Sequence, residues 1–540
     1  MTATLHIAAG LLVMTAAVAA VAKRLGLPLP ILLVLAGIGL ALVPGLPAVE
    51  LAPDAVLLLF LPPILYYAAF GMSWQAFRAN LRPIVLLAVG CVAATTAAVA
   101  AAAHLLLGLP WAAGFVLGAV VSPPDVVAPL AVARRLGIPR RVTAVLEGEG
   151  LVNDATALVL FSFAVAAVTT GAFSAARAAA TFTAVVAGET VYGLCLGWLM
   201  LRLRYAARDP RVEVTLSLLT PYLAFWLPHQ LGGSGVLATV VSGLYVGWKG
   251  VELIRSDTRL QALFFWDFVT YVIEGALFLL TGLQARVVLR GLDAADWRQL
   301  LLSAAVVCAV VIVVRFLVVL PATYLPRLLS PRLRERDPPP PWQFPFAIAF
   351  TGIRGVVSLA AALSLPVGLA AGDPFPSRDL ILFLTFCVIL VTLVAQGLTL
   401  PAVMRRLGLI EVGREEREAQ RHREAAARAE TSRAALRRLE DAVRGHGVDP
   451  EAMGPLRAHY QARVDHLEAR RNGGDSARGI GGKIEKVELE LIEAERARLN
   501  ELVREGVIGD DVRRRIERDL DLGEQRSRGN RTGLGPGEAD

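Results

Sequence analysis

Cysteine is scarce in this sequence. Only four of the 540 residues are cysteines, and all of them lie inside apolar runs. They are Cys91, Cys195, Cys308 and Cys387. Their spacing fits neither a disulfide framework nor a thiolate metal site, and we therefore interpret them as small buried apolar residues. We expect no cofactor.

Charge is also low and unevenly spread. Charged residues make up 19% of the chain and hydrophobic residues 55%, and the mean hydropathy is +0.55. This composition excludes an ordinary soluble protein and predicts a membrane domain over residues 1–409 with a polar tail over residues 410–540. The net charge of +7 does not indicate a nucleic-acid partner, because the basic residues lie in short loops and in a mixed-sign tail.

Long uncharged stretches occupy most of the first 409 residues. A helix needs roughly 20 predominantly apolar residues to cross a bilayer. On this criterion we predict an all-α polytopic membrane protein with about thirteen transmembrane helices. The expected spans lie near residues 3–22, 29–47, 52–72, 83–107, 110–133, 142–169, 181–203, 212–228, 234–250, 263–285, 299–325, 343–370 and 379–404.

Basic residues alternate between the connections. Every second connection, counted from the first, is rich in Lys and Arg, and the others have few. The rich connections hold Lys23, Arg24, Arg78, Arg82, Arg134, Arg135, Arg140, Arg141, Arg202, Arg204, Arg208, Arg211, Lys249, Arg255, Arg259, Arg327, Arg332, Arg334 and Arg336. Because positive loops stay inside, we expect a multi-pass protein of the plasma (inner) membrane with its N-terminus outside and its C-terminus cytoplasmic. The first apolar run is interpreted as a span and not as a cleaved signal peptide.

An odd number of spans permits an internal inverted repeat. Spans one to six would match spans eight to thirteen, with the seventh as a connector. Matching spans would then have opposite orientations, as in inverted-repeat transporters.

The segment Ser122-Pro123-Pro124-Asp125 interrupts the expected fifth span. Pro123 and Pro124 lack backbone N–H groups and break the helix. Irregular backbone at membrane depth survives only where it is buried in protein or lines a watery cavity. Asp125 is therefore a candidate ion ligand beside freed carbonyl groups. The alternative is a proline kink with a capping aspartate.

The sixth span carries an acidic segment, Glu147 to Asp154. Asp154 lies ~20 Å along the helix from Arg141 at a rise of ~1.5 Å per residue, which places it near the middle of the membrane. A carboxylate at that depth marks an ion or proton path. Asn153 can orient or contact the site without carrying charge, and Gly150, four residues before Asp154, leaves space above the carboxylate.

The segment Thr351-Gly352-Ile353-Arg354-Gly355 predicts another broken helix in the twelfth span. A buried Arg354 needs a carboxylate partner. Glu149 is the candidate, with Glu147 and Asp125 as rivals. The pair is interpreted as structural, because arginine does not release its proton at accessible pH.

Other acids are weaker candidates for the ion path. Glu274 lies in the expected tenth span and is the strongest of them. Glu189 and Glu213 are interpreted as groups near connections or in local hydrogen bonds. In the tail, residues 411–446, 450–471 and 483–522 predict charged helices, and we expect disorder from about residue 524.

Taken in order along the chain, these motifs resemble those of the cation/proton antiporter 1 family, which includes bacterial Na+/H+ antiporters and animal Na+/H+ exchangers. The motifs are Leu61-Pro62-Pro63, Ser122-Pro123-Pro124-Asp125, Gly148 to Asp154, Gly232 to Ala238 and Gly352-Ile353-Arg354-Gly355. The resemblance covers residues 5–409, and the helical tail looks like that of the long bacterial branch.

The resemblance implies a thirteen-span inverted-repeat fold, crossed and broken fifth and twelfth helices, and a homodimer. At matching positions it implies that Asp154 carries the ion and the proton, so that Na+ binds at Asp154 with Asn153 and Asp125 nearby. It also implies that Glu149 pairs with Arg354.

The chain departs from the family pattern at several positions. Many members have Thr in place of Pro124 and Ser in place of Gly150. Some have an acid after the Leu-Pro-Pro motif, where this chain has Tyr66 and Tyr67. Two ion-coordinating side chains are therefore missing, which leaves the ion selectivity open.

The expected function is secondary active antiport of Na+ for H+ across the plasma membrane, for pH and sodium homeostasis, with Li+ or K+ as alternative ions. Proton and cation would compete for Asp154, and Asn153 in place of a second carboxylate favours electroneutral exchange. A K+/H+ antiporter with the same mechanism is the nearest alternative. An ion channel and an intramembrane aspartyl protease using Asp125 and Asp154 are remote ones. We expect no enzymatic activity, and membrane lipid and a second copy of the chain as partners.

Overall fold

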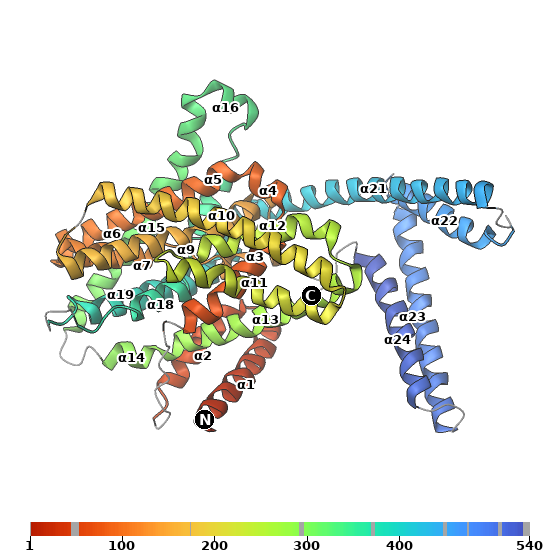
Figure 1. Cartoon of the computed structure of the whole chain (residues 1–540), viewed down its shortest axis with the longest axis horizontal. Helices are drawn as coiled ribbons and strands as arrows, with labels where there is room; N and C mark the ends of the chain where they lie inside the picture. Colours follow the sequence, from red (N-terminus) through yellow and green to blue (C-terminus); the bar gives the residue numbers. More distant parts are fainter. Residues whose placement is uncertain are drawn as a thin grey trace. The chain divides into compact units, whose positions relative to one another are not determined.

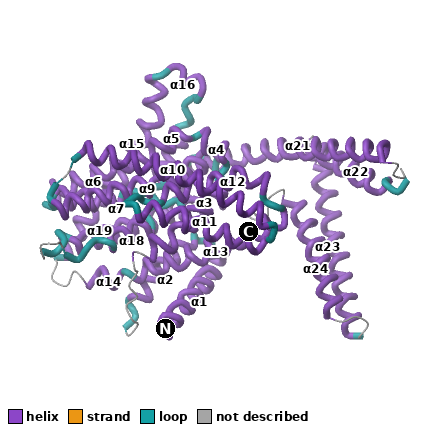
Figure 2. Tube along the Cα trace, viewed as in Figure 1, coloured by secondary structure: helices purple, strands orange, loops and turns teal. Residues whose placement is uncertain are grey.

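Helices make up nearly all of the described chain in the computed structural model (Figure 1). The structure describes residues 2–44, 53, 55–172, 174–290, 296–368, 373–446, 451–471, 475–505 and 510–532. These residues contain no β-strand, and an isolated bridge joins Gly368 to Pro374. The predicted all-α fold is confirmed, and Figure 2 shows how short the loops between the helices are.

The helices follow one another with little intervening chain. Up to residue 136 they are α1 (Thr2–Leu25), α2 (Leu29–Ala41), the π-helix η1 (Ala55–Phe60), α3 (Leu61–Gly71), α4 (Trp74–Ala79), α5 (Leu81–Val85), the π-helix η2 (Leu86–Cys91), α6 (Val92–Leu107), α7 (Trp111–Val121) and α8 (Val127–Leu136). From residue 140 to 336 they are α9 (Arg140–Thr170), α10 (Ala175–Ala207), α11 (Pro210–Gln230), α12 (Val236–Leu253), α13 (Ser256–Leu283), α14 (Ala285–Arg290), α15 (Trp297–Leu329) and α16 (Pro331–Arg336). The remaining ones are α17 (Gln343–Phe350), α18 (Val356–Leu363), α19 (Arg378–Val391), the π-helix η3 (Thr392–Gln396), α20 (Gly397–Arg406), α21 (Leu409–His446), α22 (Gly454–Arg471), α23 (Asp475–Arg504) and α24 (Asp510–Thr532).

Seven helical stretches of the described residues are long and apolar enough to cross a membrane. They are Leu81–Leu107, Arg140–Thr170, Ala175–Ala207, Val236–Leu253, Thr258–Arg290, Trp297–Leu329 and Arg378–Arg406. Every other expected span also overlaps a helix or a pair of helices. A multi-pass membrane protein explains this architecture, since a helix satisfies its own backbone polar groups in lipid. The number of crossings and the inverted repeat stay predictions.

The chain divides into two compact units, Met1–Gly413 and Arg414–Asp540. In the second unit, α23 and α24 lie side by side (Figure 1), and Arg496 pairs with Asp521 at 2.5 Å and with Glu524 at 2.7 Å. Disorder was expected from about residue 524, whereas α24 continues to Thr532. Arg, Glu and Gln in this segment are good helix formers, which explains the longer helix. Residues 533–540 lie outside the described residues.

The N-terminus of α12 is capped by a glutamate from another helix. Glu189 of α10 accepts hydrogen bonds from the backbone N–H groups of Ser234, Gly235, Leu237 and Ala238, at 2.6 to 3.3 Å. The first N–H groups of a helix have no intrahelical partner, and a carboxylate also complements the positive end of the helix dipole. Of the two interpretations of Glu189, a position near a connection agrees with its bonds to Ser234 and Gly235, whereas its hydrogen bonds are long-range and not local.

Small residues bring neighbouring helices into backbone contact. Gly37 of α2 lies against the carbonyl group of Leu279 and the Cα of Gly282 in α13, which leaves no room for a β-carbon. Figure 1 shows the two helices lying against each other. Close packing at small residues is a common way to associate helices where lipid removes the hydrophobic driving force.

This contact generates a prediction with a control on the same helix. Gly37→Ala should destabilise the protein by about 1–3 kcal/mol, because the added methyl group must push α2 away from α13. Gly39→Ala should be neutral or slightly stabilising, since Gly39 is exposed and has open space around it. Thermal unfolding of the two purified variants in detergent measures the difference. Equal melting temperatures would show that the α2–α13 contact is not tight.

Candidate functional site

The fifth expected span is broken into two helices. Helix α7 ends at Val121 and α8 begins at Val127. The backbone N–H of Asp125, within this break, donates a hydrogen bond to the carbonyl group of Ile353 at 2.7 Å. The break expected at Pro123 and Pro124 is therefore present, and one of its freed groups is satisfied by a distant segment.

That distant segment is the second break. Helix α17 ends at Phe350 and α18 begins at Val356. The backbone N–H of Arg354 donates to the hydroxyl group of Thr392 in η3 at 3.0 Å. The two interrupted helices therefore meet at their breaks, as the resemblance implied for a crossed pair.

The Arg354 guanidinium group satisfies carbonyl groups at both breaks. Its Nε donates to the carbonyl of Val121 at 2.8 Å, and its second nitrogen donates to Ser122 at 3.2 Å. A further hydrogen bond reaches the carbonyl of Gly352. A buried cation at the C-terminal end of α7 complements the negative end of that helix. The Arg354 guanidinium group therefore donates to carbonyl groups that the helix breaks leave free, and not to a carboxylate.

Glu149 pairs with a different arginine from the one predicted. Arg315 of α15 donates two hydrogen bonds to the Glu149 carboxylate, at 2.7 and 2.9 Å, and both side chains are almost completely buried. The predicted Glu149–Arg354 pair is therefore wrong. The rival Glu147 forms a solvent-exposed pair with Arg134 at 3.1 Å. A bidentate pair gives each carboxylate oxygen a charged donor, which offsets the cost of burying the charge.

The sequence contained a signal for a buried ion pair at Arg315 that our interpretation missed. Arg315 is a lone charge in the middle of Trp297–Leu329, which has the highest mean hydropathy, 2.8, of the seven long stretches. An intramembrane arginine needs a partner by the same rule that was applied to Arg354. Arg315 also donates to the carbonyl of Ile348 at 3.0 and 3.2 Å, which ties α15 to α17.

Gly150, Gly352 and Gly355 leave space for side chains of neighbouring segments. A β-carbon on Gly352 would collide with the Arg315 side chain, and one on Gly355 would collide with the Asp125 carboxylate. Gly150 was expected to leave space above Asp154. In the structure, the Val126 side chain lies against Gly150, so this glycine lets the first break approach α9.

Asn153 joins α9 to the first break and keeps one oxygen free. Its Nδ2 donates to the carbonyl of Pro124 at 2.6 Å, and the residue is fully buried. This bond fixes the amide orientation, because the reverse orientation would place two acceptors together. The Oδ1 atom is buried and has no hydrogen-bond partner among the described residues. An orphaned buried acceptor needs an explanation, such as an ion or a water.

Asp154 follows Asn153 on α9 and is half-buried. Its carboxylate has no hydrogen bond or ion pair in the described part of the chain, and it lies within electrostatic reach of Asp125. Asp125 accepts a hydrogen bond from the N–H of Val127 at 2.9 Å and so also caps α8. Glu274 of α13 is half-buried and likewise lies within electrostatic reach of Asp125.

The polar groups of this region fall into two sets, those with hydrogen-bond or ion-pair partners and those without. Glu149 and Arg354 have partners that fix them, whereas Asp154 and the Asn153 Oδ1 have none among the described residues. Oxygen atoms are the ligands that hard cations prefer. Among the described residues, no three His, Cys, Asp or Glu side chains form a cluster that could hold a metal ion tightly. The Asp154 carboxylate and the Asn153 Oδ1 have the chemistry to accept a hard cation, and the carboxylate can also accept a proton.

The comparisons with known proteins agree with this class of site. The family described as sodium/hydrogen exchanger, transmembrane, matches residues 11–406. The chain belongs to this family, which consists of multi-pass membrane transporters and not of enzymes.

The relatives extend the match to nearly the whole chain. An uncharacterized Na+/H+ exchanger of Mycobacterium tuberculosis is 38% identical over 530 residues, which cover 95% of this chain and 96% of that protein. The Na+/H+ antiporter ApNhaP of Aphanothece halophytica is 33% identical, over 71% of this chain and 70% of its own. The structure of the sodium proton antiporter MjNhaP1 from Methanocaldococcus jannaschii has the same fold, with a TM-score of 0.56 at 22% identity over 75% of this chain and 99% of that one.

The corrected ion pair generates a double-mutant prediction. Arg315→Met should cost about 3–5 kcal/mol of stability, because it leaves the Glu149 carboxylate buried without a partner. Adding Glu149→Gln should recover part of this loss, since no buried charge then remains unpaired. The yield of monodisperse protein and its melting temperature in detergent measure both steps.

The control uses the residue that was first assigned as the partner. Arg354→Met should also destabilise the protein, but adding Glu149→Gln should make it worse, because Arg315 then loses its carboxylate. Recovery in the Arg354→Met background, or simple additivity with Arg315→Met, would contradict the assigned pairing.

Proposed function

We propose that this protein is a secondary active antiporter that exchanges Na+ for H+, with Asp154 as the group that binds either ion. The observation that carries the proposal is the half-buried carboxylate of Asp154, which follows Asn153 in the chain; among the described residues neither this carboxylate nor the buried Oδ1 of Asn153 has a partner. An intramembrane carboxylate without a partner is costly unless an ion or a proton joins it. Family membership and the names of the relatives support Na+ and H+ as the ions.

The ligands of the cation follow from which oxygens remain free. Asp154 would provide the charge, Asn153 a carbonyl oxygen, and Asp125 an oxygen that is not used to cap α8. Pro124 contributes through its carbonyl group, which holds Asn153 in place. Gly150 contributes indirectly, by allowing Val126 and the first break to lie against α9. Glu274 is a further acid that could join the path.

Competition at one carboxylate produces the exchange. A proton on Asp154 removes the charge that attracts Na+, and Na+ at the site displaces the proton. If the site crosses the membrane only when occupied, the outward movement of one ion is coupled to the inward movement of the other. The breaks in α7–α8 and α17–α18 place main-chain dipoles at this position, as in transporters with interrupted helices.

A broader ion range is the second candidate. Antiporters of Bacillus pumilus and Bacillus subtilis that are each 33% identical to this chain are named for sodium, potassium, lithium and rubidium. This chain also has proline at position 124 and glycine at position 150, where a hydroxyl side chain would otherwise be available to the ion. K+/H+ exchange by the same mechanism is therefore tested in parallel with Na+/H+ exchange.

The setting in the cell is part of the proposal. The basic connections favour a plasma-membrane protein with its N-terminus outside and the charged tail, residues 410–540, in the cytoplasm. Exposed large apolar side chains such as Val191, Trp198 and Leu199 on α10 would face lipid or a second protomer. The homodimer rests on the resemblance to the antiporter family. The physiological role would be pH and sodium homeostasis.

Proton flux in everted membrane vesicles tests the function directly. Adding Na+, K+ or Li+ separately should dissipate an imposed proton gradient for each ion that the site accepts. Asp154→Asn should abolish this response while the protein stays folded, because asparagine cannot release a proton. Glu252→Gln, which changes an exposed acid on α12, is the matched control and should exchange normally. Substantial pH-dependent exchange by folded Asp154→Asn would refute the role of Asp154.

The charge count generates a second test. If Asp154 carries either one monovalent cation or one proton, no net charge crosses in a cycle. A membrane potential, worth ~2.3 kcal/mol per charge per 100 mV, then has nothing to act on. Initial exchange rates in proteoliposomes held at different potassium diffusion potentials, with valinomycin, should therefore be equal. A rate that rises steeply with potential would mean that Asp125 or Glu274 also titrates, and a sustained current without proton movement would indicate a channel.

A further inference from the structure

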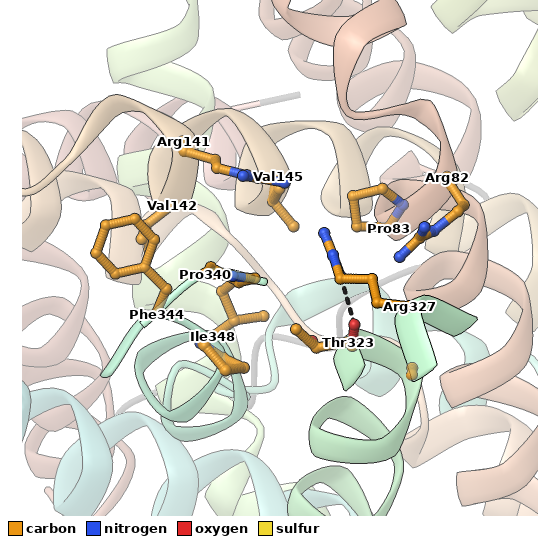
Figure 3. Close-up of a pocket in the computed structure, with 12 residues that line it drawn as sticks. Arg82, Pro83, Arg141, Val142, Val145, Thr323, Arg327, Pro340, Phe344 and Ile348 are labelled. Atoms are coloured by element: carbon orange, nitrogen blue, oxygen red, sulfur yellow. Dashed lines mark hydrogen bonds between the residues drawn. The ribbon is translucent and has the colours of Figure 1, made fainter. Parts of the chain in front are cut away.

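A small cavity lies in the first unit, away from Asp154. Its walls come from α5, α9, α15, α17 and Pro340, which precedes α17. Figure 3 shows the residues that line it, with the side chains of Arg82, Arg141 and Arg327 coming from three different helices toward the same space. All three arginines belong to connections that the positive-inside pattern assigns to the cytoplasmic side.

Two of these arginines, Arg141 and Arg327, share one carboxylate. Arg141 pairs with Asp337 at 2.6 Å, and Arg327 pairs with the other oxygen of Asp337 at 2.5 Å. The Asp337 carboxylate is the acid that acts electrostatically on Arg82, and Arg141 and Arg327 are the cations that act on it. Three guanidinium groups and one carboxylate leave two positive charges uncompensated in this cluster.

Arg82 is the member without a partner. Its Nε and one of its terminal nitrogens are buried and have no hydrogen-bond partner among the described residues. A guanidinium group prefers to form two parallel hydrogen bonds to an oxyanion. Leaving such donors buried and unpaired is costly, so a ligand that accepts from them would be stabilised.

The remaining walls strengthen the attraction for an anion. Val142, Val145, Phe344 and Ile348 are apolar, and they reduce screening by water around the guanidinium groups. The N-terminal turn of α9, which carries Arg141, adds the positive end of a 31-residue helix. Access is open on one side, because the Arg141 side chain is 36% exposed, whereas the Arg327 side chain is 5% exposed.

We propose that this cavity is a binding site for a phosphate group, with Arg82 as the principal donor and Arg141 and Arg327 as supporting charges. The phosphate can be a free inorganic or small-molecule phosphate of the cytoplasm, or the headgroup of an anionic phospholipid. Ile348 connects the site to the Glu149–Arg315 pair, since its carbonyl accepts from Arg315 while the residue also lines the cavity. An occupied cavity would therefore hold α5, α9 and α17 together.

Thermal unfolding of the purified full-length protein in detergent tests the site. One arm compares sodium phosphate with sodium chloride at equal Na+ concentration, with choline chloride added to the chloride sample to equalise the ionic strength. The other compares added phosphatidylglycerol with phosphatidylcholine. At about ten times the dissociation constant, the bound ligand should raise the melting temperature by roughly 1–2 °C. Stabilisation by inorganic phosphate indicates the soluble source, and stabilisation by phosphatidylglycerol alone indicates the lipid headgroup.

Two variants and a control localise the effect. Arg82→Gln should abolish the ligand-dependent shift, and Arg82→Lys, which keeps the charge but loses the planar fork, should reduce it. Arg78→Gln removes an exposed arginine of the neighbouring helix α4 and should leave the shift unchanged. The proposal is overturned if neither ligand stabilises the wild-type protein, or if folded Arg82→Lys and Arg82→Gln respond as strongly as the wild type does. If Arg82→Gln does not fold, the wild-type, Arg78→Gln and Arg82→Lys proteins still decide it.

Discussion

The structure depends on how two interrupted helices satisfy their freed backbone groups in a membrane. Pro123 and Pro124 end the regular hydrogen bonding of α7, and the Gly352–Gly355 segment does the same for α17. Lipid offers no hydrogen bonds, so each broken end must find its partners within the protein. The N–H of Asp125 bonds to the carbonyl of Ile353, and the Arg354 guanidinium group takes carbonyls on both sides of the crossing. Each break therefore supplies hydrogen-bond partners for the other.

This requirement divides the buried polar groups into two classes. Arg354 and the Glu149–Arg315 pair are fully engaged, and they hold α7, α9, α15 and α17 in place around the crossing. Asp154 and the Oδ1 of Asn153 remain without partners among the described residues, although they lie on the same helix as Glu149. The proposed exchange would use groups of the second class, because a group that already has an ideal partner would have to lose that partner to bind an ion. The engaged groups keep the free groups at a fixed position.

Glycines allow this arrangement because they let charged groups and backbone approach closely. Gly352 leaves room for the stem of Arg315, and Gly355 leaves room for the Asp125 carboxylate. Gly150 lets the first break lie against α9, which brings Pro124 within reach of Asn153. These positions are under steric constraint, so their conservation in relatives would not by itself indicate contact with an ion.

The sequence by itself determined the elements and the kinds of charge that they carry. Hydrophobic runs of membrane length predicted the helices, and the Pro-Pro and Gly-x-x-Gly segments predicted where two of them break. Asp125, Asp154 and Glu274 became candidates for the ion path because they are isolated acids in apolar runs. These features depend on local covalent geometry and on the cost of placing each side chain in lipid, and both follow from the residue types alone.

The tertiary structure decided which charged side chains meet. Arg315 lies 166 positions from Glu149 and Arg354 lies further away, and the sequence gives no distance between helices, so only packing could assign the pair to Arg315. The same applies to the free oxygen of Asn153 and to the cavity of three arginines, because both depend on contacts between segments that are remote in the chain.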